Sequence, residues 1–393
     1  MSTSPLANSP IGLLVPVGGY DPRRGADYSA SAYLPNQLPD DLVLSGATHN
    51  ALSRAMSKVA RADQAMVQLP NPELLARLVI RQEAVSTSAI EGTYVQMEEV
   101  LQADFLASSE YSGDVAEVYN YVLAAEAAVD WIREPRPISV HLLEYLQRQL
   151  VTGTTSDGPQ AGRVRDVQVF IGVQGHRIED ARFIPCPPGQ RLTDGLLHWE
   201  AWINRPSDLP LLARLALGHY QFETLHPFND GNGRLGRLVM LLQLIAAEEL
   251  RLPSIALSPW LEANRRKYQD HLYQVSVTGD FEPWIVFVCQ AIEAQAVAAV
   301  RRVDRLVAVR NRMLEELKGH KAKGTPLEIA RELIGYPMLT VNAMKDRHGV
   351  TYQAANTAVR RLVDLGYLRQ FSEGNYDRVF VCDEVLDVLV QAP

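Results

Sequence analysis

Residues 226–237 have the sequence His226-Pro227-Phe228-Asn229-Asp230-Gly231-Asn232-Gly233-Arg234-Leu235-Gly236-Arg237. Before this stretch, residues 211–225 carry leucines and Phe222 at helical spacing, and Pro227 interrupts that pattern. After it, residues 238–245 are apolar on every side, which is typical of a buried helix and too short for a bilayer span. The stretch is therefore predicted to be a tight loop between two buried helices.

The residues of this loop are suited to binding an anion and activating a hydroxyl. Residues 231–233 would begin the second helix, where free N–H groups favour a phosphate and glycines allow close approach. Arg234 and Arg237 share one helix face, and two guanidiniums there indicate a polyphosphate. Asp230 is a candidate Mg²⁺ ligand, and His226 is a candidate general base. The glycine spacing also fits a dinucleotide-binding fingerprint, but that fingerprint follows a strand, and here a helix precedes it.

The stretch resembles the signature of the Fic family, His-x-Phe-x-Asp/Glu-Gly-Asn-Gly-Arg-x-x-Arg, and matches it at each fixed position. The resemblance implies a mainly α fold and transfer of AMP from ATP to a side-chain hydroxyl of a protein. It also implies that His226 is the general base, that Asp230 binds Mg²⁺, and that both arginines bind the β- and γ-phosphates. The other loop positions assigned to the nucleotide are Asn229, Gly231, Asn232 and Gly233. The alternative is a capped helix turn with incidental polar residues.

A second stretch, from Thr87 to Gly92, could by itself be a solvated helix end. It is similar to the inhibitory helix of many Fic proteins, Ser/Thr-x-x-x-Glu-Gly/Asn, in the subclass where this helix precedes the core. The resemblance implies that Glu91 pairs with Arg237, occupies the place of the ATP γ-phosphate and misorients the α-phosphate. A displacement of about 1 Å can cost on the order of a hundredfold in rate.

Residues 167–171 and 182–184 are short β-like runs around a Gly-Val-Gln-Gly-His turn, and they predict a small hairpin. An exposed hairpin edge can pair with an extended peptide. The Fic flap at this place is similar and does this for the modified protein, so Ile171 and Gly172 would lie near the nucleotide. An ordinary surface hairpin is the alternative.

Tyr268 lies on a predicted helix and could stack on a nucleotide base. The family has a Tyr-Tyr pair at this place, whereas this chain has Gln269 second, so a purely structural Tyr268 remains an open alternative.

The chain has 393 residues, which is room for two or three domains. Its net charge of −8 argues against a dedicated nucleic-acid binder. Three distant cysteines show neither disulfide nor metal-ligand spacing, and no signal-peptide pattern precedes the helices. We therefore expect a cytoplasmic protein that does not associate with membranes.

Four regions are predicted. Residues 1–110 hold a Pro- and Gly-rich extended arm and the inhibitory-helix region, 111–300 the Fic catalytic core, and 301–324 a basic linker helix. Residues 325–393 show three helices and a hairpin, which resemble a winged helix-turn-helix domain. Its recognition helix offers only two arginines, Arg360 and Arg361, against Asp364, so a protein-binding or dimer-supporting role is favoured over DNA binding.

The resulting hypothesis is a protein adenylyltransferase that uses ATP and Mg²⁺ and is inhibited by Glu91. The alternatives are an enzyme that removes AMP or acts in both directions, and a DNA-binding regulator whose core senses ATP. The sequence does not identify a target protein. From the family, self-modification and a homodimer are expected.

Overall fold

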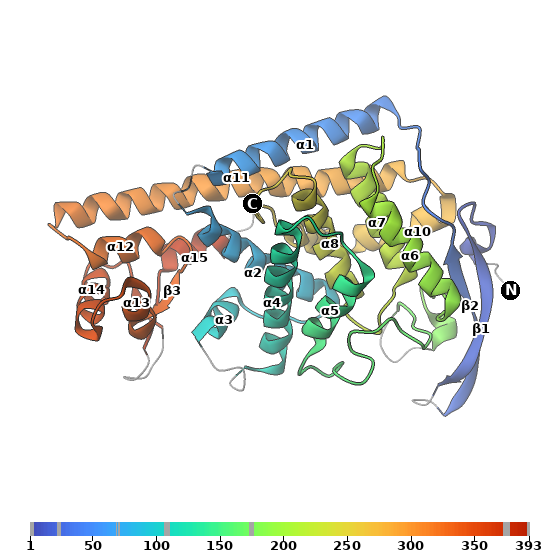
Figure 1. Ribbon diagram of the computed structural model, residues 1–393, viewed down its shortest axis with the longest axis horizontal. Helices are drawn as coiled ribbons and strands as arrows, with labels where there is room; N and C mark the ends of the chain where they lie inside the picture. Colours follow the sequence, from blue (N-terminus) through green and yellow to red (C-terminus); the bar gives the residue numbers. More distant parts are fainter. Residues whose placement is uncertain are drawn as a thin grey trace.

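The computed structural model describes residues 4–21, 25–67, 69, 71–105, 111–172, 177–371 and 378–390, and these form a mainly α protein (Figure 1). The helices are α1 (Gly46–Val67), α2 (Pro72–Glu91), α3 (Met97–Gln102), α4 (Gly113–Arg133), α5 (Val140–Val151), α6 (Gln190–Asn204), α7 (Leu211–Leu225), α8 (Asn232–Ala246), α9 (Ser258–Ala263), α10 (Arg265–Thr278), α11 (Glu282–Gly319), α12 (Thr325–Glu332), α13 (Val341–His348), α14 (Tyr352–Asp364) and α15 (Asp383–Val390). The strands are β1 (Gly12–Asp21), β2 (Ala26–Pro35), β3 (Met338–Thr340), β4 (Arg369–Gln370) and β5 (Val379–Val381).

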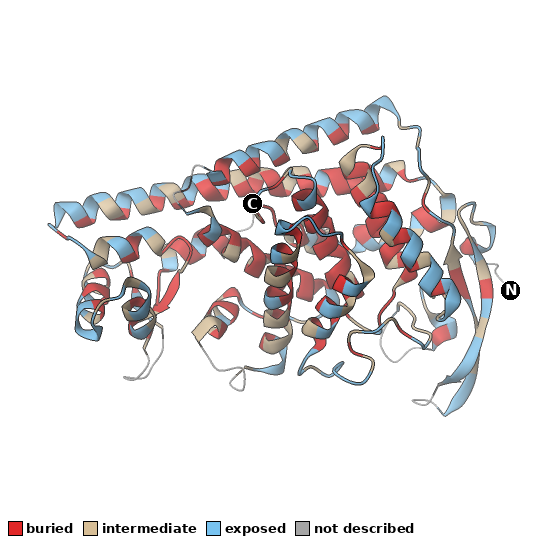
Figure 2. Cartoon of the chain, viewed as in Figure 1, coloured by how far each residue is buried: buried red, intermediate tan, exposed pale blue. Residues whose placement is uncertain are grey.

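The helices α7 and α8 lie in the larger of two hydrophobic clusters and are buried on nearly all sides (Figure 2). Leucines and Phe222 of α7 pack against the apolar run of α8, because neither helix has a continuous polar face to leave in water. The prediction of a tight loop between two buried helices is confirmed. The loop, residues 226–231, is therefore fixed at both ends by the core.

The extended arm predicted for residues 1–40 is instead largely a β-hairpin. The ten-residue strands β1 and β2 pair antiparallel along their whole length. Prolines exclude helix here but are compatible with a two-stranded sheet, in which each strand has a free edge. The buried Tyr33 of β2 donates its N–H to the carbonyl of Ile184 at 2.8 Å, which attaches the hairpin to the catalytic core.

The helix α11 is one continuous helix of 38 residues, so the boundary predicted at residue 300 falls inside it. Its first half contributes to the larger hydrophobic cluster and its second half, with Val303, Leu306 and Met313, to the smaller one. Residues 301–319 of the predicted linker are therefore part of a core helix. By length and composition α11 could cross a membrane, but 61% of its apolar window is buried inside the fold, as in a core helix.

The C-terminal unit, residues 325–390, combines four helices with a sheet of order β3-β5-β4. Its three predicted helices appear as α12, α13 and α14. Thr340 and Thr351 cap α13 and α14, since their hydroxyls accept N–H bonds of 3.1 and 3.2 Å. The predicted hairpin appears as β4 paired with β5, while its Ser-Glu-Gly-Asn turn (372–375) lies outside the described residues. The helix α15 was not predicted.

The helix α2 contributes to both hydrophobic clusters. Leu75 and Leu78 pack in the smaller cluster with α11 and the C-terminal unit, whereas Ala84 and Ile90 pack in the larger one. The side-chain amide of Gln82 donates to the carbonyl of Leu389 at 3.2 Å. The first part of α2 is therefore held by the C-terminal unit, and its last turn faces the 226–237 stretch.

Candidate active site

His226 ends α7 in a left-handed conformation, with φ of 51°. Its N–H donates to Phe222 at 2.9 Å, and its Nδ1 lies 3.3 Å from the carbonyl oxygen of Glu223. A proton on Nδ1 donated to that carbonyl leaves Nε2 as the acceptor. Burial, with a smaller contribution from the charge of Arg165, lowers the pKa of His226 to about 4. The imidazole is thus neutral at physiological pH and able to accept a proton.

Gly231 precedes α8 with φ of 81°, a conformation that favours glycine, so the turn can open directly into the helix. The Asn232 side chain braces this turn, because its oxygen accepts from the N–H of Phe228 at 2.8 Å and its nitrogen donates to the carbonyl of Phe228 at 2.7 Å. Both ends of the amide are therefore used within the loop. The Asn232 side chain is therefore already occupied, and the phosphate contact predicted for it falls to the backbone amides at the start of α8.

Arg237 is almost fully buried and faces the inhibitory motif predicted on α2. Its Nη2 lies 2.6 Å from Glu91 Oε1, its Nε donates to the Thr87 hydroxyl at 2.7 Å, and Nη2 also donates to the Thr87 carbonyl at 3.1 Å. Burial raises the pKa of Glu91, but the arginines outweigh it and the net direction is down. The ion pair predicted from the sequence is therefore present.

Two glycines allow this contact. Gly92 ends α2 with φ of 107°, which lets the chain turn away directly after Glu91. Gly233, on the first turn of α8, has no Cβ, and a Cβ there would overlap with Glu91 Oε1 and lie 2.9 Å from Arg237 Nη1. The carboxylate of Glu91 thus lies against the backbone at the N-terminus of α8.

Arg234 is bound by two other carboxylates. Its Nη1 lies 2.7 Å from Glu117 Oε1 on α4, and its Nη2 lies 3.2 Å from Asp230 Oδ1. Asp230 also accepts the N–H of Gly231 at 2.6 Å, and its side chain is 41% exposed. The two arginines predicted to act together therefore have separate partners, and only Arg237 borders the cavity described next.

A cavity of ≈ 780 Å³ lies between the last turn of α2, the start of α8, α10, residues 170–172 and residues 180–183. Its lining includes seven of the predicted site residues, namely Glu91, Ile171, Gly172, His226, Gly233, Arg237 and Tyr268. The remaining predicted residues, Thr87, Gly92, Asn229, Asp230, Gly231, Asn232 and Arg234, are not part of that lining. The cavity thus joins the histidine, the helix N-terminus and one of the two guanidiniums of the 226–237 stretch in a single space.

Tyr268 lines this cavity but is only 4% exposed, and its hydroxyl lies 2.7 Å from His219 Nε2. Its ring packs beside His219 and Trp284. The structure therefore gives Tyr268 a packing role in the cavity wall, which favours the structural alternative.

The hairpin predicted for residues 167–184 is reduced to a single bridge among its described residues. Ile171 and Phe183 exchange two backbone bonds of 2.8 and 3.2 Å, and the described residues on either side form no longer strand. The outer residues of the two runs bond elsewhere, since the carbonyl of Val167 accepts from Arg165 Nη1 and that of Ile184 accepts the N–H of Tyr33. Val-Gln-Gly-His (173–176) of the predicted turn lies outside the described residues.

Glu223 and Arg165 are charged residues of the site that were not predicted. Glu223, one turn before His226, lines the cavity, and burial raises its pKa to about 7 although Arg237 lowers it. Gly236 makes room for it, since a Cβ there would lie 2.7 Å from Glu223 Oε1. Glu223 could have been predicted, because its spacing of three residues from His226 places both on one helix face. Arg165 bonds to the backbone of the loop, and no pattern in the surrounding sequence identified it as a site residue.

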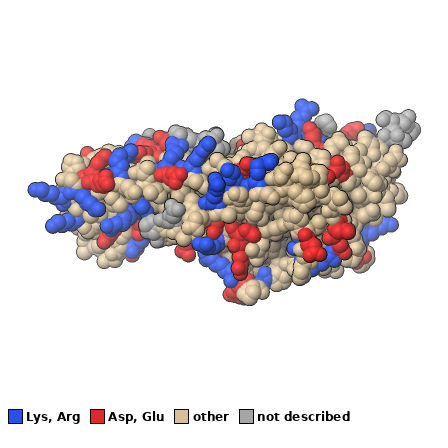
Figure 3. Space-filling model, turned by 90° about the horizontal axis from the view of Figure 1, so that it is seen from above, with Lys and Arg blue, Asp and Glu red and all other residues tan. Residues whose placement is uncertain are grey.

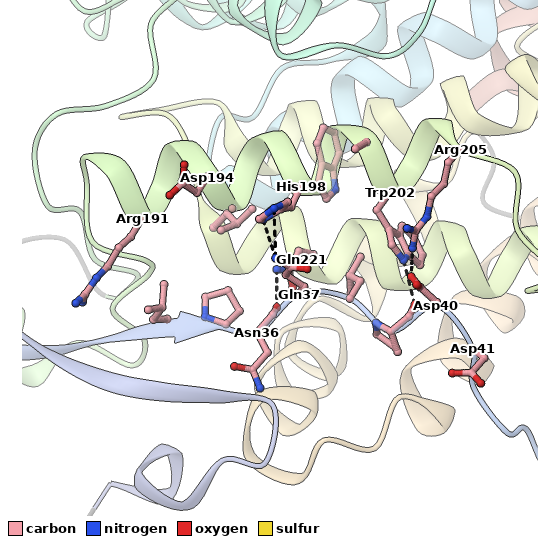
Figure 4. A pocket seen from close by; sticks show the side chains of 18 residues that line it. Asn36, Gln37, Asp40, Asp41, Arg191, Asp194, His198, Trp202, Arg205 and Gln221 are labelled. Atoms are coloured by element: carbon pink, nitrogen blue, oxygen red, sulfur yellow. Dashed lines mark hydrogen bonds and ion pairs between the residues drawn. The ribbon is translucent and has the colours of Figure 1, made fainter.

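A second cavity of ≈ 910 Å³ lies between residues 34–41 and α6 (Figure 4). Its polar side chains pair across it, Asp40 with Arg205 and Gln37 with His198 at 2.9 Å. None of the predicted site residues lines it. The smaller cavity is therefore the candidate active site.

Comparison with known families identifies the same part of the chain. A family model described as Fic/DOC family N-terminal matches residues 49–130, and one described as Fic/DOC family matches residues 137–244. The first match contains α2 with Glu91, and the second contains the 226–237 stretch.

Curated relatives are similar over about half of this chain. Protein adenylyltransferase fic-1 of Caenorhabditis elegans is 27% identical over 216 residues, which are 53% of this chain and 39% of that protein. Protein adenylyltransferase Fic of Aedes aegypti is 29% identical over 187 residues, which are 46% of this chain and 34% of that protein. The chain thus matches less than half the length of either relative.

Among solved structures, a Fic family protein from Desulfovibrio desulfuricans G20 has a similar fold. The superposition has a TM-score of 0.56 at 19% identity and covers 88% of this chain and 98% of that one. At this identity the likeness concerns the fold alone.

Proposed function

Because this chain belongs to the Fic/DOC family, we propose that it is a protein adenylyltransferase that transfers AMP from ATP to a Ser, Thr or Tyr hydroxyl of a protein. The observation that carries this proposal is the cavity in which a neutral His226, the N-terminus of α8 and Arg237 face one another. The histidine accepts the proton, and the helix N-terminus with the guanidinium accommodates phosphate.

In the proposed reaction the target hydroxyl oxygen attacks the α-phosphorus of ATP. Its proton passes to His226 Nε2, a bond forms between that oxygen and phosphorus, and the bond to the β-phosphate bridging oxygen breaks. Pyrophosphate leaves with that electron pair. The protein contributes mainly positioning and charge stabilisation, as in phosphoryl transfer generally.

Asp230 is the residue we propose for Mg²⁺, which would neutralise phosphate charge. Burial raises the pKa of Asp230 but Arg234 outweighs it, so the carboxylate is ionised, and it is partly exposed. Among the described residues no cluster of three or more His, Cys, Asp or Glu side chains could hold a metal. One carboxylate fits Mg²⁺, which keeps waters and phosphate oxygens as its other ligands. Arg234 then serves to hold Asp230.

We further propose that Glu91 inhibits the enzyme by occupying the phosphate position on Arg237. The carboxylate lies at the N-terminus of α8, where a phosphate would otherwise approach the same guanidinium. Because its side chain is 39% exposed, the pair is screened by water, and we assign it about 1 kcal/mol. Displacing Glu91 from Arg237 therefore costs little of the free energy of ATP binding.

Intact-mass spectrometry after incubation with ATP and Mg²⁺ tests this function. Wild type is compared with Glu91→Gly and with the double variant Glu91→Gly, His226→Ala. We expect added AMP that increases in Glu91→Gly and disappears in the double variant. If no variant carries AMP, with or without candidate target proteins, the transferase proposal is wrong.

Removal of AMP remains a second candidate reaction. Glu91 lines the same cavity as His226 and could orient a water molecule for it. Loss of AMP from a pre-modified protein that depends on Glu91 would favour this direction.

The C-terminal unit has the element order of a winged helix-turn-helix, and we propose that fold for residues 325–390. An ATP-sensing DNA-binding regulator is the alternative function. Lys and Arg gather toward the end of the molecule where α11 ends, but Asp and Glu lie among them (Figure 3). Arg312 and Arg369 pair with Glu384 and Asp383. Binding to random duplex DNA at low salt tests it, and absence of binding excludes it.

The cellular context is proposed in the same way. The target protein is unknown, and self-modification and a homodimer are inferences from the family. All three cysteines are free and buried, which is compatible with a reducing cytoplasm.

A further inference from the structure

Arg165 is a buried arginine whose side-chain donors are used by backbone carbonyls around the catalytic loop. Its Nε donates to His226 at 2.7 Å, Nη1 to Val167 at 2.9 Å, and Nη2 to Leu225 at 3.2 Å and to Cys186. Its own N–H donates to the carbonyl of Pro227 at 2.9 Å. One residue thus connects residues 225–227 with both segments that lead to the Ile171–Phe183 bridge.

These contacts place a positive charge at the C-terminal end of α7. The last carbonyls of a helix lack internal partners and carry partial negative charge, so a guanidinium is well suited to bind them. Among the described residues Arg165 forms no ion pair with a carboxylate, and it is only 2% exposed. Burial lowers its pKa to about 10, so it stays cationic at neutral pH.

His226 depends on this support in two respects. Its left-handed backbone, unusual for a residue with a side chain, is held between the N–H bond to Phe222 and the carbonyl bond from Arg165. The imidazole is also faced by charged or titratable groups from several elements, namely Glu223 of α7, Glu91 of α2, Asp230 of the loop, and Arg165. Of these, only Arg165 favours the neutral imidazole.

We propose that Arg165 is a positioning residue for the transfer reaction, which fixes the backbone of His226 to the segments around the Ile171–Phe183 bridge and, together with burial, favours its unprotonated imidazole. Arg165 does not line the cavity, so it acts through His226 and not on the nucleotide. The predicted effect of Arg165 on the rate of AMP transfer rests on the proposed function. The predicted effect on the protonation of His226 does not.

The test uses the full chain in the Glu91→Gly background, with Arg165→Lys and Arg165→Met. Lysine keeps the charge but cannot reach all four carbonyls, and methionine keeps an unbranched apolar stem but loses the charge. Arg214 supplies a matched control, because its guanidinium donates to the carbonyls of Trp202, Ile203 and Arg205 at the end of α6, away from the active site. Arg214→Lys and Arg214→Met are made in parallel.

We expect both Arg165 variants to lower kcat for AMP transfer by tenfold or more, because about 1 Å of misplacement has effects of this order. The Kd for ATP should stay within about twofold of the parent, since no contact of Arg165 reaches the cavity. Only Arg165→Met should raise the pKa of His226, by about one pH unit, and move the acid limb of the pH–rate profile to higher pH. The Arg214 variants should leave kcat and this pKa unchanged.

The pKa of His226 is followed by NMR of ¹³C-labelled histidine, with His226→Ala to assign the signal, so this measurement does not require transfer activity. An unchanged His226 pKa in Arg165→Met would overturn the proposal. So would equal losses of kcat, ATP affinity and melting temperature in the Arg165 and Arg214 variants. If the Glu91→Gly parent transfers no AMP while the pKa moves as expected, the proposed function fails and the electrostatic role of Arg165 stands.

Discussion

The carboxylate of Glu91 lies 2.6 Å from the guanidinium of Arg237, although 146 residues separate them in the sequence. The contact joins the last turn of α2 to the first turns of α8. It stands directly beside His226 in the wall of one cavity. Access of a phosphate to Arg237 and the position of α2 are therefore linked.

Replacing the Glu91 charge should relieve inhibition in a graded way. Glu91→Gln keeps the size of the side chain but loses the ion pair, and Glu91→Gly also empties the space beside Gly233. We expect initial rates of AMP transfer to rise in the order wild type, Gln, Gly, with roughly tenfold between the extremes, since tenfold corresponds to about 1.4 kcal/mol. Equal rates in all three proteins would show that Glu91 does not limit the reaction.

Gly233→Ala should separate Glu91 from Arg237 without substituting either residue, because the new Cβ would take the place of Glu91 Oε1. In a double-mutant cycle we expect Glu91→Gln to cost about 1 kcal/mol of unfolding free energy in wild type and almost nothing in Gly233→Ala. Urea denaturation measures all four proteins. Additive effects would mean that Gly233 is not required for the contact.

Glu223 should make stability fall as the pH rises. Burial raises its pKa from 4.5 to about 7, so the folded protein binds more protons than the unfolded chain between these values. The free energy of unfolding should then decrease between about pH 4.5 and 7, by up to about 3 kcal/mol from this group. Glu223→Gln removes the titration and should flatten the decline relative to wild type. Parallel curves for the two proteins from pH 5 to pH 8 would contradict this prediction.

Asp230→Asn should weaken the dependence of activity on Mg²⁺. The amide loses the negative charge expected at the metal and also the ion pair with Arg234. We expect the Mg²⁺ concentration for half-maximal transfer to rise by at least about tenfold, and EDTA to abolish transfer by wild type. Glu117→Gln is the control, because it removes the other partner of Arg234 and leaves the Asp230 carboxylate in place. A Glu117→Gln protein with the same Mg²⁺ dependence as Asp230→Asn would assign the effect to Arg234 instead.

The sequence predicted the parts of the site that are local in the chain. Helical spacing on both sides of Pro227 located the loop, and the glycines predicted how α8 begins. The approach of Glu91 to Arg237 was predicted from the family resemblance, because the distance along the chain carries no physical signal. The inhibitory function of the contact stays a prediction.

Other features depended on tertiary packing. The two arginines of the motif share one face by spacing, yet they have different partners because α4 places Glu117 beside Arg234 only. Tyr268 was a candidate for stacking on a base, but its hydroxyl lies against His219 and its ring packs beside His219 and Trp284. Arg165 had no sequence signal at all, since its partners are backbone carbonyls that every residue possesses. The hairpin of β1 and β2 was missed because prolines and glycines masked its alternation.

The dual packing of α2 has a consequence for how the protein responds to heat or to a protease. Opening of the C-terminal unit removes the contacts around Leu75 and Leu78 but none within α7 and α8. Regions of a fold open locally with free energies below that of global unfolding. Mild damage to the C-terminal unit should therefore loosen the helix that carries Glu91 first and leave the catalytic loop assembled. A partly degraded protein would then be more active than the intact one, because it would lose inhibition by Glu91 before it loses catalytic activity.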